Sequence, residues 1–129
     1  MDKRAACCIL IVDDDADIVE TVQIILEMHG YRVLTAGDGR RALELLQGAE
    51  PPSLILLDLM MPDMNGAQFR AAQLRDPALS AIPVVAVSGD GSVREKAAVL
   101  GVDGIAKPVA LDTLLETVAR HCRPHDARA

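Results

Sequence analysis

Asp58 is the residue whose type and position in the sequence point most clearly to a reactive group. An apolar run at 54–57 leads directly into it, and a loop rich in turn residues follows at 59–66. An unbroken run of this kind predicts a strand buried on both faces of a parallel sheet. A carboxylate at the carboxyl end of such a strand lies where open α/β sheets bind ligands. Asp58 is therefore the candidate reactive group. A role limited to helix capping is less favoured, because Asp63 and Asn65 lie closer to the next helix.

Polar residues of complementary type also end three other predicted strands: Asp13 and Asp14 after 8–12, Ser88 after 82–87, and Lys107 after 104–106. The carboxyl ends of parallel strands share one edge of a sheet, so we expect these groups to converge although they are distant in sequence. Three carboxylates a few ångströms apart cannot all stay ionised without compensation. The Lys107 ammonium and a divalent cation are the two available compensators.

Mg²⁺ suits this set of ligands. It takes a few carboxylate oxygens at ~2.0–2.1 Å, keeps several waters and binds phosphate oxygens. A backbone carbonyl from the loop after Asp58 would supply a further oxygen. Zinc is not favoured, because no histidine or cysteine stands at these strand ends.

A carboxylate beside a hard cation, with a hydroxyl and an ammonium opposite, suits the capture of a phosphoryl group. Asp58 would attack phosphorus in line and form an acyl phosphate. The cation, Lys107 and the Ser88 hydroxyl would take the charge on the phosphoryl oxygens. The sequence contains neither a Walker loop nor a GxGxxG fingerprint, so a bound nucleotide as donor is not supported.

Helical spacing of apolar residues predicts five segments that alternate with the strands: from Ala16 to Gly30, at 42–48, at 67–74, from Ser92 to Gly101, and at 111–118. Ser92 and Glu95 predict a capping box for the fourth of them. A mixed run at 31–36 is typical of an edge strand. Strand–helix alternation of this kind predicts a parallel sheet with right-handed crossovers and helices on both faces.

Composition restricts the class of protein. The 129 residues fit one domain, with a core at about 7–122 and a tail at 123–129. The formal net charge of −6 disfavours a nucleic-acid surface. Three cysteines do not make a disulfide framework, and no apolar run approaches the ~20 residues that span a bilayer. We expect a cytoplasmic protein with reduced cysteines, no secretory signal and no contact with a membrane.

Four motifs together resemble the receiver domain of bacterial two-component response regulators, the family of the chemotaxis receiver protein. The resemblance covers residues 9 to about 118. In chain order the motifs are Ile11-Val12-Asp13-Asp14-Asp15, Leu57-Asp58-Leu59-Met60-Met61-Pro62-Asp63-Met64-Asn65-Gly66, Val87-Ser88-Gly89 and Lys107-Pro108. It implies a flavodoxin-like receiver fold, which is a doubly wound five-stranded parallel sheet in the order 2-1-3-4-5 with five helices.

The resemblance also implies a function in phosphorelay signalling. Asp58 would accept a phosphoryl group from a histidine kinase or a histidine phosphotransfer protein, and the chain would turn over no separate substrate. The implied site is Asp14 as a direct Mg²⁺ ligand, Asp13 as a ligand directly or through water, Met60 as a ligand through its backbone carbonyl, and Ser88 and Lys107 on the phosphoryl oxygens. A cis peptide bond before Pro108 is implied as well.

The sequence departs from the family at two positions. Members usually carry an aromatic residue three positions before the lysine, where this chain has Gly104, and a bulky residue after Lys-Pro, where it has Val109. An aromatic switch in the last strand is therefore impossible here. We expect output to run through the loop and fourth helix at 88–101 instead.

Other interpretations remain open beside the leading one. An aspartate-nucleophile phosphatase would use a similar acyl phosphate, but such enzymes carry a second acid two residues on, where this chain has Met60. A flavodoxin-like cofactor carrier is remote, because the chain has only two aromatic residues, Tyr31 and Phe69, to flank a flavin ring.

Five further positions have simpler interpretations than chemistry. Asp15 is favoured as a helix cap over a metal ligand. Asp90 is expected to be solvated, with a possible influence on hydrolysis of the acyl phosphate. His121, Cys122 and His125 look like a metal cluster, but their place in a fraying last turn disfavours one.

Overall fold

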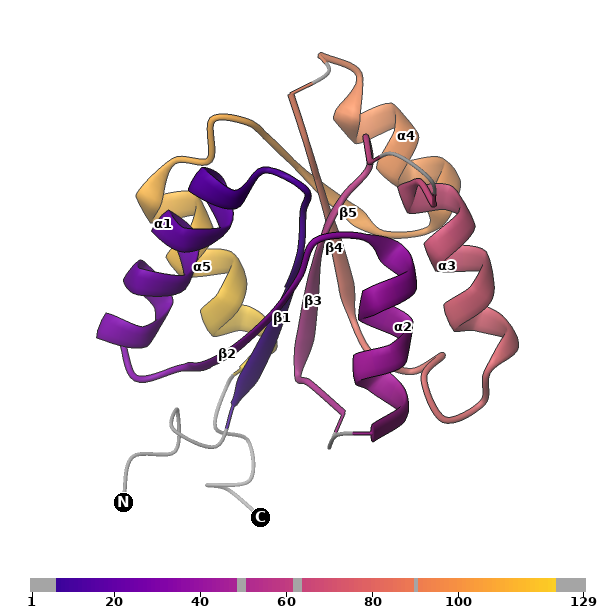
Figure 1. Cartoon of the computed structure of the whole chain (residues 1–129). Coiled ribbons are helices and arrows are strands. Elements are labelled where there is room, and N and C mark those ends of the chain that lie inside the picture. The colour runs from indigo at the N-terminus through magenta and orange to yellow at the C-terminus, as the bar shows by residue number, and fades with distance from the viewer. Residues whose placement is uncertain (1–6, 49–50, 62–63, 90, 123–129) are drawn as a thin grey trace.

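The computed structural model describes residues 7–48, 51–61, 64–89 and 91–122. Five strands alternate with five helices along it (Figure 1): β1 Cys8–Val12, α1 Ala16–Met28, β2 Arg32–Ala36, α2 Gly39–Gly48, β3 Leu54–Asp58, α3 Gly66–Arg75, β4 Val84–Ser88, α4 Val93–Leu100, β5 Asp103–Ala106 and α5 Leu111–His121. Asp63, Asp90 and His125 lie outside the described residues; the sequence suggested capping for the first and solvation for the second, and it disfavoured metal binding for the third. No described helix has both the length and the apolar character that crossing a bilayer requires.

All five strands form one parallel sheet in the order β2-β1-β3-β4-β5, which confirms the predicted order. Figure 1 shows α1 and α5 on one face of this sheet and α2, α3 and α4 on the other. The strands pair in a register that sets their carboxyl ends side by side. Val12 lies opposite Leu57, and Ser88 lies opposite Ala106. The residues that follow these strands therefore share one edge of the sheet.

The core consists of two hydrophobic layers, one on each face of the sheet. Every residue of β1, β3 and β4 is buried, as expected of central strands. Side chains alternate between the faces along a strand. Ile9 and Ile11 thus pack towards α1 and α5, whereas Leu10 and Val12 pack with residues of α2, α3 and α4. Phe69 of α3 fills the second layer and is fully buried.

The element boundaries differ from the sequence expectations at a few points. β4 begins at Val84, two residues later than predicted, and includes Ser88 as its last residue. The capping box predicted at Ser92 is wrong, because the Ser92 side chain makes no capping hydrogen bond. Its backbone (φ −103°, ψ 23°) is neither helical nor extended, whereas a capping residue is normally extended. A capping box forms instead at the start of α3, between Asn65 and Gln68.

Gly104 allows α4 to approach β5 closely. A Cβ atom at this position would lie 3.0 Å from the Cβ of Ala97 and 3.1 Å from the carbonyl oxygen of Val93. The second of these contacts is with helix backbone, which cannot turn away as a side chain can. A larger residue at 104 would therefore require α4 to shift by a few tenths of an ångström away from β5. The departure from the family pattern at this position corresponds to a helix packed directly on the last strand.

Candidate functional site

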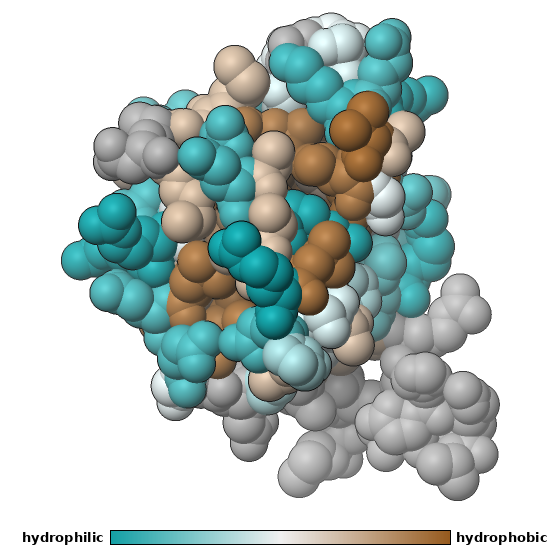
Figure 2. All heavy atoms as spheres, turned by 90° about the vertical axis from the view of Figure 1, so that its right-hand side faces the viewer, coloured by the Kyte–Doolittle hydropathy of each residue, from teal (hydrophilic) through white to brown (hydrophobic). Residues whose placement is uncertain are grey.

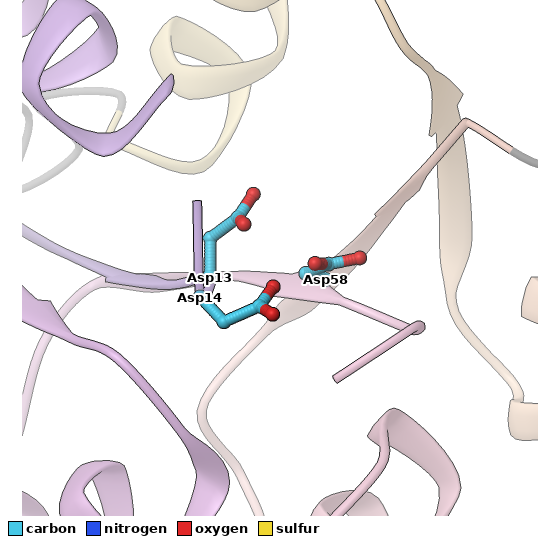
Figure 3. A group of neighbouring side chains, drawn as sticks. All are labelled: Asp13, Asp14 and Asp58. Atoms are coloured by element: carbon cyan, nitrogen blue, oxygen red, sulfur yellow. The ribbon is translucent and has the colours of Figure 1, made fainter. Parts of the chain in front are cut away.

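Three carboxylates gather at the sheet edge where β1 and β3 end (Figure 3). Asp13 and Asp14 follow β1, Asp58 is the last residue of β3, and each offers an oxygen within 4.8 Å of the others. The Asp13 and Asp58 side chains are buried, whereas Asp14 is exposed. The pairing of Val12 with Leu57 explains this convergence, because the residues after them must then be neighbours. Among the described residues, this is the one group of three or more His, Cys, Asp or Glu able to hold a metal ion.

Lys107 reaches this cluster from the end of β5. Its Nζ lies 2.8 Å from Oδ2 of Asp13 and 3.6 Å from Oδ2 of Asp58. Its backbone N–H donates to the carbonyl of Ser88 at 2.8 Å, which fixes the point from which the side chain extends. Burial by itself would lower the pKa of Lys107, but the hydrogen bond and charge of Asp13, with a further contribution from Asp58, raise it. The ammonium therefore stays charged at neutral pH.

Asp58 sits in a mixed electrostatic environment. The pKa of its carboxyl is raised from 3.8 to about 6, mainly by burial and also by the negative charge of Asp13. The backbone N–H of Met60, which donates to Oδ1 of Asp58 at 3.0 Å, and the positive charge of Lys107 act in the opposite direction. One ammonium thus does not compensate all the acids. The donor set, made of hard carboxylate oxygens with no nitrogen or sulfur, fits Mg²⁺ as the missing positive charge.

The raised pKa of Asp58 predicts a pH-dependent stability when divalent cations are chelated. The folded state holds the proton more tightly than the unfolded chain, so this stabilisation is present below the unfolded value of 3.8 and is lost as the pH rises through about 6. Asp58→Asn lacks this titration. We expect the wild type to lose roughly 2–3 kcal/mol relative to Asp58→Asn between about pH 4 and pH 7. Urea titrations in EDTA measure the free energy of unfolding of both proteins at each pH. Excess Mg²⁺ should reduce the difference between them. Parallel dependences of the two free energies on pH would contradict the prediction.

The remaining acids near β1 divide into two roles. Asp15 caps α1, accepting from the N–H groups of Asp17 at 3.1 Å and Ile18 at 3.3 Å, which confirms the capping interpretation. Asp13 uses Oδ1 to accept from the N–H of Asp15 at 2.9 Å and Oδ2 to bind Lys107. Asp14 keeps an exposed carboxylate beside them.

The other predicted site residues lie near the same edge with less defined contacts. Ser88 ends β4 and is fully buried, beside Ala106 in the register. Met60 follows Asp58 with a side chain that is 59% exposed, and its backbone carbonyl as a metal ligand stays a prediction. The Lys107–Pro108 peptide bond is cis, which confirms that expectation. His121 and Cys122 lie in the last turn of α5 and at its end, away from this edge.

The sequence analysis missed a groove beside the site. It has a volume of about 310 Å³ and lies between α1 and the start of α5. Its lining includes Ile18, Val22 and Ile25 from α1, with Lys107, Val109 and Leu111 from the other side. Leu111 was expected in the buried stripe of α5, but it is 51% exposed. The spacing of apolar residues gives no signal for this groove, because the groove depends on how α1 and the start of α5 pack.

Comparisons with known proteins agree with this architecture. A family model for the response regulator receiver domain matches residues 9–119. Response regulator MprA of Mycolicibacterium vanbaalenii is 36% identical over 124 residues, which are 92% of this chain and 52% of that protein. Protein PilH of Pseudomonas aeruginosa is 36% identical over 85% of this chain and 93% of its own length. The chain thus spans about half the length of the MprA relative.

Solved structures show the same likeness. Chemotaxis protein CheY4 of Vibrio cholerae superposes with a TM-score of 0.80 at 33% identity, covering 88% of this chain and 97% of that one. The receiver domain of a signal transduction histidine kinase from Syntrophus aciditrophicus gives a TM-score of 0.81 at 32% identity, covering 91% and 90%.

Proposed function

The chain belongs to the response regulator receiver domain family, and we propose that residues at about 7–122 form one such domain, with Asp58 as the residue that carries the phosphoryl group. One observation carries this assignment. The Asp58 carboxylate lies at a sheet edge with two further acids within 4.8 Å and the Lys107 ammonium at 3.6 Å. This arrangement combines a nucleophile with the charges that a phosphoryl group needs.

The ligands for Mg²⁺ in this proposal are Asp14, Asp58, the Met60 carbonyl and Asp13. Both oxygens of Asp13 already accept hydrogen bonds, whereas the Asp14 carboxylate is exposed. This difference favours Asp14 as a direct ligand and Asp13 as one that acts through water. When bound, the cation would neutralise negative charge on the phosphoryl oxygens and on the acids.

The chemical step is an in-line displacement by the Asp58 carboxylate. An oxygen of Asp58 forms a bond to phosphorus, the bond from phosphorus to the donor nitrogen breaks, and the donor imidazole, already protonated at its other ring nitrogen, leaves as a neutral ring. The Met60 N–H holds the carboxylate in a fixed orientation at 3.0 Å. Lys107 and the Ser88 hydroxyl would then bind the phosphoryl oxygens, and Met60 at the second position after Asp58 offers no acid or base for a phosphatase.

The proposal places the output on α4 and the segment at 88–101. α4 packs directly on β5 at Gly104, and the strand before it ends at Ser88 in the site. Figure 2 shows hydrophobic side chains gathered on the face that carries α3 and α4. A groove of about 310 Å³ lies there, with Met60, Val99 and Leu100 in its lining. A movement of the loop after Ser88 towards the phosphoryl group would change this groove.

Beryllofluoride, which mimics an aspartyl phosphate, tests the switch. With Mg²⁺ present it should shift the backbone amide NMR signals of residues 88–101 more than those of α2. The reason is that the mimic draws the loop after Ser88 towards Asp58, and α4 follows. Asp58→Asn is the control and should show no shifts. If the signals of residues 88–101 stay unchanged while Asp58 is occupied, the proposed output is wrong.

We further propose that the phosphodonor, a histidine kinase or a histidine phosphotransfer protein, docks in the groove between α1 and α5. Lys107 lines this groove and also touches the acids, so a donor seated there has its histidine close to Asp58. The exposed Leu111 offers an apolar contact to such a partner. The proposal places the domain in the cytoplasm, where phosphohistidine donors are formed from ATP.

Leu111→Asp should impair docking of the donor without changing the phosphorylation chemistry at Asp58. A charge in this groove should slow transfer from the cognate histidine donor by at least about tenfold, because a buried unpaired carboxylate opposes docking. Phosphorylation by acetyl phosphate should stay unchanged. Leu74→Asp on α3 is the matched control, because Leu74 is 50% exposed and Leu111 is 51% exposed. Equal slowing by both substitutions would contradict docking at this groove.

A further inference from the structure

Two cysteines from opposite ends of the chain meet at the base of the domain. Cys7 immediately precedes β1 and Cys122 ends α5, and Sγ of Cys7 donates to the carbonyl oxygen of Cys122 at 3.3 Å. Both are held by backbone hydrogen bonds. The Cys7 carbonyl accepts from Arg32 at 3.0 Å, and the Cys122 N–H donates to Val118 at 2.8 Å. The contact therefore joins two ordered elements.

Because of the pleat of β1, Cys7 lies on the same face of the sheet as Cys122, whereas its neighbour Cys8 does not. Side chains alternate between the two faces of a strand. Cys7 packs with the layer that contains Ile9, Ile11 and Cys122, on the face covered by α1 and α5. Cys8 is one residue further along, so its side chain points towards the other face. All three cysteines are free thiols in this structure.

The two thiols of the pair differ in their environments. Cys122 is only 3% exposed, and burial, with a further contribution from the adjacent Cys7 thiol, raises the pKa of its thiol to about 12. Cys122 by itself is therefore a poor nucleophile towards a soluble oxidant. Cys7 is half-buried, so it is the thiol that such an oxidant reaches first.

We propose that Cys7 and Cys122 are an oxidation-sensitive pair that closes to an intramolecular disulfide, with a peroxide as the oxidant. The sulfur of Cys7 attacks one peroxide oxygen, the O–O bond breaks, and one water leaves with the thiol proton. The resulting sulfenic acid is then attacked by the sulfur of Cys122. The S–O bond breaks, and the hydroxide leaves as a second water with the Cys122 proton. Two thiols are oxidised and one peroxide is reduced to two waters.

The bond would fasten the last turn of α5 to the central strand β1. The residues it joins are 115 positions apart, and a disulfide that closes a long loop restricts the unfolded chain most strongly. It would form at the start of β1, whereas Asp13 lies after the end of that strand. The proposal thus does not rest on phosphorylation, and it concerns how firmly α5 is attached.

Hydrogen peroxide added to the reduced full chain tests the pair. Intact mass should fall by two hydrogens, and a non-reducing peptide map should show a Cys7–Cys122 link. The melting temperature should rise by roughly 10 °C and return when dithiothreitol is added. Cys8→Ala should behave like the native chain, whereas Cys7→Ser should lose both the link and the rise. A Cys7–Cys8 link, a disulfide between two chains, or sulfinic acid as the main product would overturn the proposal.

Discussion

Asp58→Asn should gain no phosphoryl group from acetyl phosphate in the presence of Mg²⁺, whereas the native chain should gain one. The substitution keeps the size of the side chain and removes the oxygen nucleophile, and loss of a nucleophile slows such reactions on the order of 10³-fold or more. No other acid in the described part of the chain combines burial with an orienting hydrogen bond from the Met60 N–H and the ammonium of Lys107 at 3.6 Å. Intact mass measured over time gives the rate.

Asp15→Asn is the matched control for this experiment. It makes the same chemical change close to the site, and asparagine is as good a helix cap as aspartate, so α1 should be preserved. This variant should be phosphorylated at the native rate. EDTA should stop the reaction of the native chain, because the acids then lose their second compensating charge. Phosphorylation of Asp58→Asn at the native rate would place the acceptor on another residue.

Much of the site was predictable because buried parallel strands have a simple sequence pattern. Residues 54–57 must be apolar on both faces, so the first charged residue after them, Asp58, marks the strand end. The same logic located Asp13 after β1 and Lys107 after β5. The fold then brings these residues together, since the carboxyl ends of parallel strands lie at one edge of the sheet. In this fold, the candidate reactive residues at strand ends can thus be predicted from a single sequence.

Contacts set by the distance between elements were not predictable in this way. Leu111 has the spacing of a core residue, but its exposure depends on how far α1 stands from the start of α5. The Cys7–Cys122 contact joins positions 115 apart and leaves no local pattern. Ser92 has the type of a capping residue, but its backbone before α4 is not in the extended conformation that capping requires. In each case tertiary packing, rather than local preference, decides the outcome.

Charge balance connects these observations. Asp13, Asp14 and Asp58 bring three acids within 4.8 Å, and among the residues that the structure describes the Lys107 ammonium opposes them. The pKa of Asp58 is raised mainly by its burial, and the charge of Asp13 adds to this shift while Lys107 opposes it. A site left short of positive charge favours binding of a cation. In the proposed function Lys107 would have two roles, to hold the acids before phosphorylation and to bind the phosphoryl oxygens after it.

Lys107→Met removes the ammonium while it keeps a long side chain, and it should slow phosphorylation by acetyl phosphate by about 10²–10³-fold. This is the usual effect of deleting one donor that stabilises charge in a transition state. The buried Asp13 and Asp58 also lose their partner, so the pKa of Asp58 should rise further and the melting temperature in EDTA should fall. Lys107→Arg restores the charge without the compact geometry and should recover only part of the rate.

Binding of Mg²⁺ distinguishes this role of Lys107 from a general loss of the site. Removal of a positive charge beside three acids should strengthen Mg²⁺ affinity in Lys107→Met, because the cation then meets less repulsion. Isothermal titration calorimetry measures this affinity directly. Tighter Mg²⁺ binding together with slow phosphorylation would assign Lys107 to the phosphoryl oxygens. Weaker Mg²⁺ binding with the same rate loss would show instead that the substitution had disordered the three carboxylates.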